Sequence, residues 1–95
     1  MNPPEPPAPG RVLTGHTGSV NALALTSNGQ YALSGSSDNT LILWDLDNGD
    51  ALRTLVGHTA PVWGVGITPN ERYAVSASND TTLKLWDLIS GDALR

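Results

Sequence analysis

The sequence predicts an all-β fold made of two similar units, each with four short antiparallel strands. The first reason is an internal repeat, because residues 15–53 align with residues 57–95 without a gap, at an offset of 42 residues and with 22 of 39 positions identical. The second is that short aliphatic and β-branched runs alternate with turns rich in Gly, Asn, Asp and Ser. The third is that no segment combines a sustained helical period with capping residues. A fixed period of this size indicates a repeat architecture.

The composition is that of a globular chain, and it excludes several classes of protein. Of the 95 residues, 39% are apolar and 15% are charged. The absence of cysteine excludes disulfides, thiolate metal sites and cysteine nucleophiles and fits a reducing compartment, so we expect a cytoplasmic location. No apolar run reaches the ~18–20 residues that cross a membrane, and the N-terminus does not resemble a signal peptide, so we expect no membrane association. A net charge of −4 with five dispersed basic residues argues against a nucleic-acid partner.

The first ten residues, 1–10, are rich in proline and carry five of the seven prolines in the chain. Proline fixes φ and removes an amide donor, so the segment favours an extended polyproline II conformation over a helix or a strand. We interpret it as a semi-rigid linker or tail. A PxxP ligand for an aromatic-lined groove is the alternative, which the spacing alone does not establish.

A short, partly exposed strand is expected directly before each Gly-His pair. Arg11–Thr14 and Arg53–Val56 are tetrads with β-branched or aliphatic residues that precede a glycine. The strand that follows is expected at Val20–Thr26 and again at Val62–Thr68. Both are apolar along most of their length and contain small residues, a pattern typical of a strand that is buried on both faces.

Two further strands are expected in each unit, separated by tight turns. Asn28-Gly29 is a hairpin signal, because both residues accept a positive φ, whereas its counterpart at 69–71 has no glycine and must turn by other means. Each unit is therefore expected to be an antiparallel meander. The expected strands are Gln30–Ser36 and Thr40–Leu46 in the first unit, and Arg72–Ser78 and Thr82–Leu88 in the second.

Three short motifs recur at identical spacing in both units: Gly-His, Ser-x-x-x-Asp and Trp-Asp. In the first unit they begin at Gly15, Ser34 and Trp44, and in the second they follow 42 residues later. These motifs closely resemble the WD repeat, the blade of a β-propeller, and the resemblance covers residues 11–95. A single Trp-Asp pair would carry little weight, whereas two complete sets are specific.

The resemblance implies a tetrad of hydrogen-bonded His, Ser, Asp and Trp side chains in each unit. Imidazole has two nitrogens that can meet a carboxylate and a hydroxyl, and the hydroxyl can accept from the indole N–H, which is only a donor. A buried Trp needs such a partner. We expect each network to tie the loop before the innermost strand to the second and third strands. The eight residues are His16, Ser34, Asp38, Trp44, His58, Ser76, Asp80 and Trp86.

A catalytic or metal-binding role is the alternative for the same side chains. A His, a Ser and an Asp in one unit suggest a hydrolytic triad, but a triad needs an exposed nucleophile and an oxyanion site. Scaffolding recurs in every repeat whereas a catalytic site is usually single, so we expect no catalytic residue. Pairing His16 with Asp38, or His58 with Asp80, leaves a zinc site incomplete. We therefore expect no metal and no cofactor.

Trp63 distinguishes the two units, because its counterpart in the first unit is Asn21. The resemblance implies a position near the start of the innermost strand, close to the central opening of the propeller. Large aromatic side chains at a binding surface often act as anchors. Contact with a partner protein and packing between blades or in the channel are both hypotheses for Trp63.

The repeat boundaries predict an N-terminal segment, 1–10, followed by two blades in 11–95. Within the latter, 11–14 is an orphan outer strand, 15–56 is a complete first blade and 57–95 is a second blade without its outer strand. Two blades cannot close a propeller, which needs ~4–8 of them, so we expect the orphan strand to complete the second blade of another chain. That strand consists of Arg11, Val12, Leu13 and Thr14.

The resemblance implies a non-enzymatic scaffold for protein–protein interaction, and the orphan strand predicts that it assembles head to tail into a ring. A ring of two-blade chains has an even number of blades, and single-chain WD-repeat propellers usually have about seven or eight. A homotetramer with eight blades is therefore expected, and a trimer with six is the alternative. The partners would be other copies of the chain and an unidentified protein. The second hypothesis is a propeller building block whose only activity is self-assembly, and the third is a propeller-type hydrolase.

Overall fold

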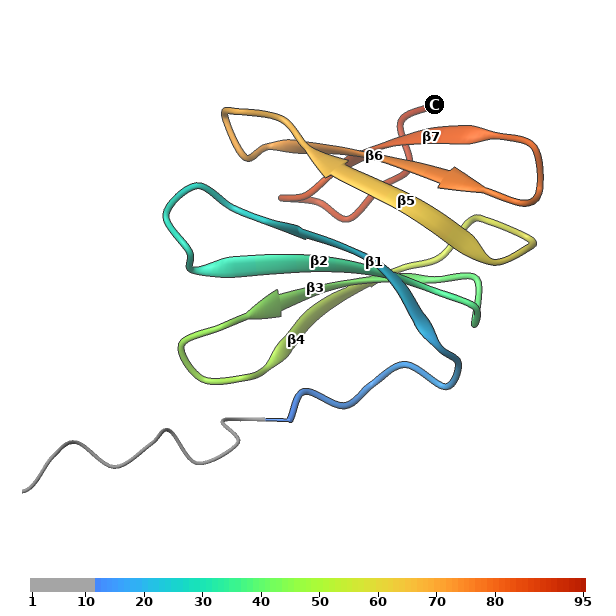
Figure 1. The fold of residues 1–95 in the computed structure, drawn as a ribbon. Helices are drawn as coiled ribbons and strands as arrows, with labels where there is room; N and C mark the ends of the chain where they lie inside the picture. The colour runs from blue at the N-terminus through green and yellow to red at the C-terminus, as the bar shows by residue number, and fades with distance from the viewer. Residues whose placement is uncertain (1–11) are drawn as a thin grey trace, which may run out of the picture.

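A computed structural model describes residues 12–95, which form two antiparallel β-sheets and no helix (Figure 1). The first sheet has four strands in the order β1-β2-β3-β4, and the second has three in the order β5-β6-β7. Consecutive strands are neighbours, so each sheet is the predicted meander. The bounds are β1 Val20–Leu25, β2 Tyr31–Ser36, β3 Leu41–Asp45, β4 Ala51–Leu55, β5 Val62–Ile67, β6 Tyr73–Ser78 and β7 Leu83–Asp87.

These seven strands lie within two residues of their predicted bounds. The eighth expected strand, Arg11–Thr14, falls partly outside the described residues, as does the whole proline-rich segment 1–10. Its described part, Val12 to Thr14, carries no strand in this single chain. Because its expected partner is a second chain, that pairing stays a prediction. No helix within residues 12–95 is long and apolar enough to span a membrane.

The turn between the first two strands of each sheet depends on asparagine rather than on glycine. In the first sheet, Asn28 Oδ1 accepts from the hydroxyl of Thr26 at 2.6 Å, and Gly29 has a φ of 71°. In the second, Asn70 accepts from Thr68 at the same distance, and Glu71 takes the left-handed place of the glycine with a φ of 62°. A positive φ is unfavourable for a residue with a Cβ. The Glu71 side chain is anchored, because its Oε1 accepts from the backbone N–H and the hydroxyl of Ser27 at 2.9 and 2.6 Å.

The two sheets pack through β5, which lies against β1 and β2 of the first sheet (Figure 1). The approach is close at Gly35 on β2, where an added Cβ would lie only 2.5 Å from Cγ1 of Val62. Glycine is therefore required there for the sheets to meet at this distance. The buried apolar cluster includes residues of both sheets: Leu33, Leu41, Leu43, Leu55, Val62, Ala74, Trp86 and Leu88.

Each sheet leaves one apolar face uncovered, which differs from the burial on both faces that was predicted for Val20–Thr26 and Val62–Thr68. On β1, the side chains of Val20, Leu23 and Leu25 are exposed, although the segment is apolar enough to suit burial on both faces. The equivalent strand β5 is more buried, because β1 and β2 cover one of its faces. No other described strand covers the outward face of β1.

The outward face of the second sheet is uncovered in the same way. Val75 on β6 is 40% exposed, whereas its counterpart Leu33 is fully buried. Leu83 on β7 is 70% exposed, whereas its counterpart Leu41 is fully buried. β5 covers β2, whereas no described strand covers the outward face of β6. The difference in exposure between equivalent residues is therefore due to their surroundings and not to their residue types.

The chain continues past β7 along the edge of the second sheet. Ala93 forms an antiparallel bridge with Trp86, and the N–H of Leu85 donates to the carbonyl of Arg95 at 2.9 Å. The pairs Trp44–Ala51 and Leu43–Arg53 are their counterparts in the first sheet. Residues 93–95 thus occupy the first half of the place that β4 fills in the first sheet.

Candidate functional site

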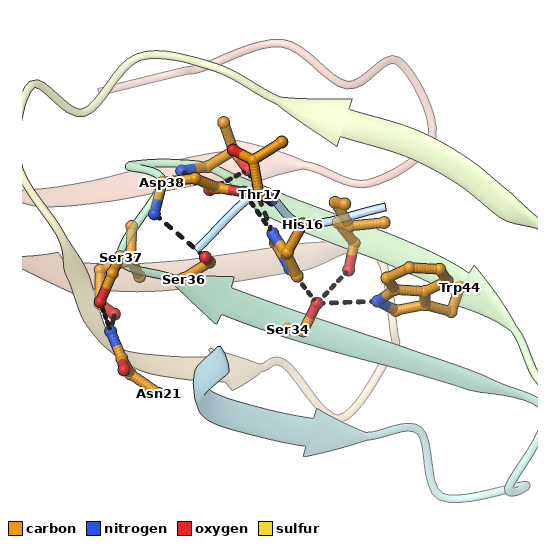
Figure 2. Close-up of polar contacts among 11 residues, drawn as sticks. His16, Thr17, Asn21, Ser34, Ser36, Ser37, Asp38 and Trp44 are labelled. Carbon is orange, nitrogen blue, oxygen red and sulfur yellow. Dashed lines mark hydrogen bonds and ion pairs between the residues drawn. The ribbon is translucent and has the colours of Figure 1, made fainter. Parts of the chain in front are cut away.

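The first tetrad joins three parts of the first sheet through one serine hydroxyl (Figure 2). His16, in the loop before β1, lies with Nε2 2.6 Å from Oγ of Ser34 on β2. Its Nδ1 lies 2.9 Å from Oδ2 of Asp38, in the turn between β2 and β3. Trp44 on β3 donates from Nε1 to the same Ser34 Oγ at 2.7 Å. The structure therefore brings together the four side chains that the sequence singles out.

The second tetrad has the same geometry. His58 lies 2.6 Å from Ser76 Oγ through Nε2 and 2.7 Å from Asp80 Oδ2 through Nδ1. Trp86 Nε1 donates to Ser76 Oγ at 2.8 Å. Each His ring also meets its Trp ring edge to face, with centroids 6.1 and 6.2 Å apart.

One arrangement of protons satisfies every group in a tetrad with a neutral imidazole. The Nδ1–H donates to the carboxylate, which can only accept, so Nε2 carries a lone pair. The serine hydroxyl donates to that lone pair and accepts from the indole N–H. No buried side-chain polar atom within residues 12–95 lacks a hydrogen-bond partner. A fully satisfied network of this kind favours a single arrangement of the strands that it joins.

The glycine before each histidine has a steric reason to be there. A Cβ on Gly15 would lie 3.1 Å from Cη2 of Trp44, and one on Gly57 would lie 3.0 Å from Cη2 of Trp86. The chain therefore passes close over the indole ring, and this brings the next residue, the histidine, within reach of the serine. In each Gly-His pair, the glycine is needed for packing against the indole and the histidine for hydrogen bonding.

Both tetrad aspartates are held ionised by their hydrogen bonds. Burial is the largest single influence on Asp38 and raises its pKa. Hydrogen bonds to the carboxylate together outweigh burial and bring the pKa of Asp38 well below its usual 3.8. They come from the side chain and backbone of Thr40, the His16 ring and the backbone N–H of Thr17. For Asp80 the hydroxyl of Thr82 is the largest influence, and it lowers the pKa against the effect of burial. The His58 ring and the backbone N–H groups of Thr59 and Thr82 add to it.

The surroundings of the tetrads do not favour the catalytic alternative. Ser34 and Ser76 are buried, and each hydroxyl is engaged by an indole and an imidazole. A nucleophile needs room for a substrate beside the hydroxyl. Within the described residues, no three His, Cys, Asp or Glu side chains are grouped as metal ligands.

Trp63 lies at the β-bulge near the start of β5 and is 53% exposed. Its counterpart Asn21 occupies the matching bulge of β1 and has a different role. The Asn21 side chain donates to Oγ of Ser37 at 2.9 Å and to the carbonyl of Val62 at 3.2 Å, so it ties β1 to the second sheet. Sequence reasoning missed this tie. The only available signal was the mismatch between the repeats at this position.

Of the four residues expected to complete another chain, Leu13 has a described contact. It packs on a cluster of Ala32, Ile42 and Trp44. Leu55, its counterpart at the end of β4, packs in the cluster that contains Trp86. The two leucines thus lie in similar surroundings one repeat apart. Val12 and Thr14 are exposed, and Arg11 lies outside the described residues.

Comparison with known proteins gives two matches to one family model. The model described as WD domain, G-beta repeat matches residues 8–45 and again residues 49–87. These two segments contain all eight residues of the tetrads.

Similar stretches occur in larger proteins. Cross-pathway control WD-repeat protein 2 of Flammulina velutipes is 51% identical over 45 residues, which are 47% of this chain and 14% of that protein. The small ribosomal subunit protein RACK1 of Caenorhabditis elegans is 53% identical over 45 residues, with the same two shares. WD repeat protein iqw1 of Schizosaccharomyces pombe is 56% identical over 36 residues, 38% of this chain and 4% of that protein. The chain therefore spans only a small part of these relatives.

Proposed function

The chain belongs to the WD domain, G-beta repeat family, and on this basis we propose that it is a non-enzymatic protein-interaction scaffold that closes into a ring with other copies of itself. The first sheet and the second sheet are then its first and second blades. The observation that carries the proposal is the unequal burial of equivalent residues on the two blades. Leu41 is fully buried where the second blade follows it, and Leu83 is 70% exposed where none does.

The two uncovered faces have the composition of the two faces that already meet inside the chain. Val20, Leu23 and Leu25 on β1 repeat Val62, Val65 and Ile67 on β5. Val75 and Leu83 repeat Leu33 and Leu41. A blade of one chain can therefore cover the open blade of another by the contact that the chain uses internally. Contacts of this head-to-tail kind close into rings when the rotation between copies permits.

The edge of the second blade supports the same proposal. Residues 93–95 pair with the second half of β7, which leaves Leu83, at its start, without the partner that Leu55 gives to Leu41 in the first blade. In the repeat alignment Leu13 is the counterpart of Leu55. We propose that Val12, Leu13 and Thr14 of a second copy add to this edge, with Leu13 opposite Leu83. Exposed strand edges recruit strands of other chains in this way.

Four chains with eight blades form the proposed assembly, and three chains with six are the alternative. The mass of the particle tests this directly. Native mass spectrometry of the 95-residue chain should give a tetramer, and deletion of residues 1–14 should abolish it, because the edge then has nothing to pair with. A monomer, or a dimer of only four blades, would defeat the ring.

Within the assembly, we assign the tetrads a structural role and Trp63 a role in contact with a partner protein. Burial of the serine hydroxyls supports the first assignment, and the exposure of Trp63 supports the second. A cytoplasmic location is part of the proposal, and the cysteine-free sequence is compatible with it.

Affinity capture with the intact ring tests the scaffold role against the alternative of self-assembly alone. Proteins retained by the wild-type ring and lost with Trp63→Ala, while the ring stays intact, would support a scaffold. If both forms of the ring retain the same proteins, Trp63 is not the contact, and if neither retains any, self-assembly is the remaining function.

A further inference from the structure

Inside the chain, an arginine of the first blade holds a turn of the second. Arg53 on β4 donates from Nη1 to the carbonyl of Ser90 at 3.1 Å and from Nη2 to the carbonyl of Ile89. A Cβ on Gly91 would lie 3.2 Å from Nη1 of Arg53, so the guanidinium lies directly on the turn. This turn, at 87–91, follows β7. Its contact with Arg53 is one of those that join the two blades.

The turn after β3, at 45–49, has the same shape and lies one repeat earlier. Gly49 has a φ of 81° and Gly91 one of 80°. The N–H of Asp47 donates to Asp45 Oδ1 at 2.9 Å, as the N–H of Ile89 does to Asp87 Oδ1. The first blade therefore presents a preformed copy of the surface that Arg53 binds, and within residues 12–95 no arginine binds it.

The two turns differ in charge. Where the second blade has Ile89, the first has Asp47, and where Arg72 forms an ion pair with Asp87 at 3.5 Å, the first blade has Gln30. The turn of the first blade thus carries carboxylates at Asp45, Asp47 and Asp50. Among the described residues, none of the three has an ion-pair partner.

The matching position on the second blade is occupied by Arg95, whose side chain has no ion-pair partner among residues 12–95. Arg95 accepts the N–H of Leu85 at 2.9 Å through its carbonyl, and Leu43 and Arg53 form the equivalent pair in the first blade. The side chain of Arg95 is exposed. In the proposed ring, Arg95 would therefore face the first blade of the next copy in the way that Arg53 faces the second blade of its own chain.

We propose that Arg95 of one chain binds the 45–49 turn of a second copy and forms there an ion pair with Asp47. The guanidinium would donate to the carbonyls of Asp47 and Asn48, as Arg53 does to those of Ile89 and Ser90. The carboxylate of Asp47 adds a charge that the contact inside the chain lacks, because Ile89 stands in its place. The inference rests on the proposed self-association and names the polar contact that directs it.

The Arg95–Asp47 ion pair would influence the orientation in which two copies meet, and the rate at which they assemble, more than the affinity between them. Its charges are complementary only when the second blade of one chain meets the first blade of the next, so it favours head-to-tail pairing over the two symmetrical alternatives. An exposed pair of this kind is screened by salt. Assembly of the wild-type chain should therefore weaken as sodium chloride rises from low to high concentration.

Sedimentation velocity over a range of protein concentrations tests the pair through charge variants. Asp47→Asn should weaken assembly about threefold, the range of an exposed ion pair. Asp47→Arg and Arg95→Asp should each weaken it about tenfold or more, because each brings like charges together. Combining them reverses the pair and should recover assembly to within about threefold of wild type. Asp50→Asn removes the same charge three residues away and is the matched control.

The outcomes separate the inference from the proposal on which it rests. If the wild-type chain stays monomeric at every concentration, the self-association is wrong and the ion pair with it. If the wild type assembles but the reversed pair does not recover assembly, or Asp50→Asn matches Asp47→Asn, the ring stands and the Arg95–Asp47 pair is wrong. Far-ultraviolet circular dichroism of each variant establishes that the chain is folded before its assembly is compared.

Discussion

The first and second blades have nearly the same interior but different junctions. The three tetrad distances agree to within 0.2 Å between the blades. In contrast, Gly35 corresponds to Ala77, and Asn21 corresponds to Trp63. The tetrad depends only on residues of its own blade, so it can repeat without change. The junction residues depend on which neighbour they meet, so they vary.

In the proposed ring, Ala77 would make the junction between chains wider than the junction within one. A Cβ at Gly35 would lie 2.5 Å from Val62, and real Cβ atoms do not come so close. The counterparts of these two residues at the junction between chains are Ala77 and Val20 of the next copy. Since Ala77 has a Cβ, the two blades of the proposed ring would have to meet there with a different spacing or with another Val20 rotamer.

The largest effect is expected from the core position at which the blades differ most in burial. Leu41→Ala should destabilise the chain by about 2–5 kcal/mol, because it leaves a cavity between the blades. Leu83→Ala should cost about 0.5 kcal/mol or less in the dissociated chain, because this side chain is mostly exposed. Urea unfolding at high dilution measures both. Equal losses would mean that Leu83 is buried in the free chain.

The next effect concerns the close approach of the two sheets. Gly35→Ala should cost roughly 1–3 kcal/mol through overpacking against Val62. Ala77→Gly should instead leave the stability of the dissociated chain nearly unchanged and allow the junction between chains to tighten. Thermal unfolding measures the first change, and the concentration at which assembly is half complete measures the second. An unaffected melting temperature in Gly35→Ala would contradict the spacing seen at Val62.

Removal of a tetrad histidine should have a comparable effect in either blade. His58→Ala leaves Asp80 and Ser76 short of partners, at a cost on the order of 1–3 kcal/mol. For a chain of this size the melting temperature should fall by several degrees. His16→Ala repeats the test in the first blade. If neither variant melts earlier, the tetrads do not stabilise the fold.

Acid is expected to act on both blades alike through their aspartates. The pKa values of Asp38 and Asp80 are lowered from 3.8 in the folded chain, so the unfolded chain binds protons first as the pH falls. Their contribution to stability is therefore complete above about pH 4 and is lost as the pH falls below it. Asp38→Asn and Asp80→Asn should each reduce the number of protons taken up on unfolding by about one. Tryptophan fluorescence in urea between pH 5 and pH 2 measures this, and an unchanged proton uptake would refute it.

The smallest effect on stability is expected at Trp63. Because this side chain is about half exposed, Trp63→Ala should change the free energy of unfolding by about 0.5 kcal/mol or less. A loss of roughly 3–5 kcal/mol would instead identify Trp63 as packed between blades. Chemical denaturation of the variant distinguishes the two roles and decides whether Trp63 stays a candidate contact.

Residue types and spacing predicted the family and the seven described strands, because both depend on local pattern. The family prediction is confirmed, and the strand bounds differ by at most two residues. The tetrads were expected from the resemblance to the WD repeat, and the donors and acceptors of His, Ser, Asp and Trp are compatible with the network that it implies.

The contacts between blades could not be predicted in the same way. Asn21 and Arg53 both donate to backbone carbonyls of the second blade. Every residue has a backbone carbonyl, so the sequence does not indicate which carbonyl a side chain will bind. The left-handed conformation of Glu71 was equally hidden, because its anchor is a serine 44 positions earlier in the chain. The open face of β1 was predicted as buried because the segment is apolar, and burial depends on a neighbour that a single chain does not supply.

The pairing of residues 93–95 with β7 has a consequence for covalent continuity. Arg95 lies where Arg53 lies in the first blade, and Val12 is the counterpart of the residue after Arg53. Residues 12–95 therefore span 84 positions, which is two whole periods of 42. A peptide bond from Arg95 to Val12 of a following copy would need no spacer. Tandem duplication of this segment would thus yield a one-chain polymer in which every strand keeps its register.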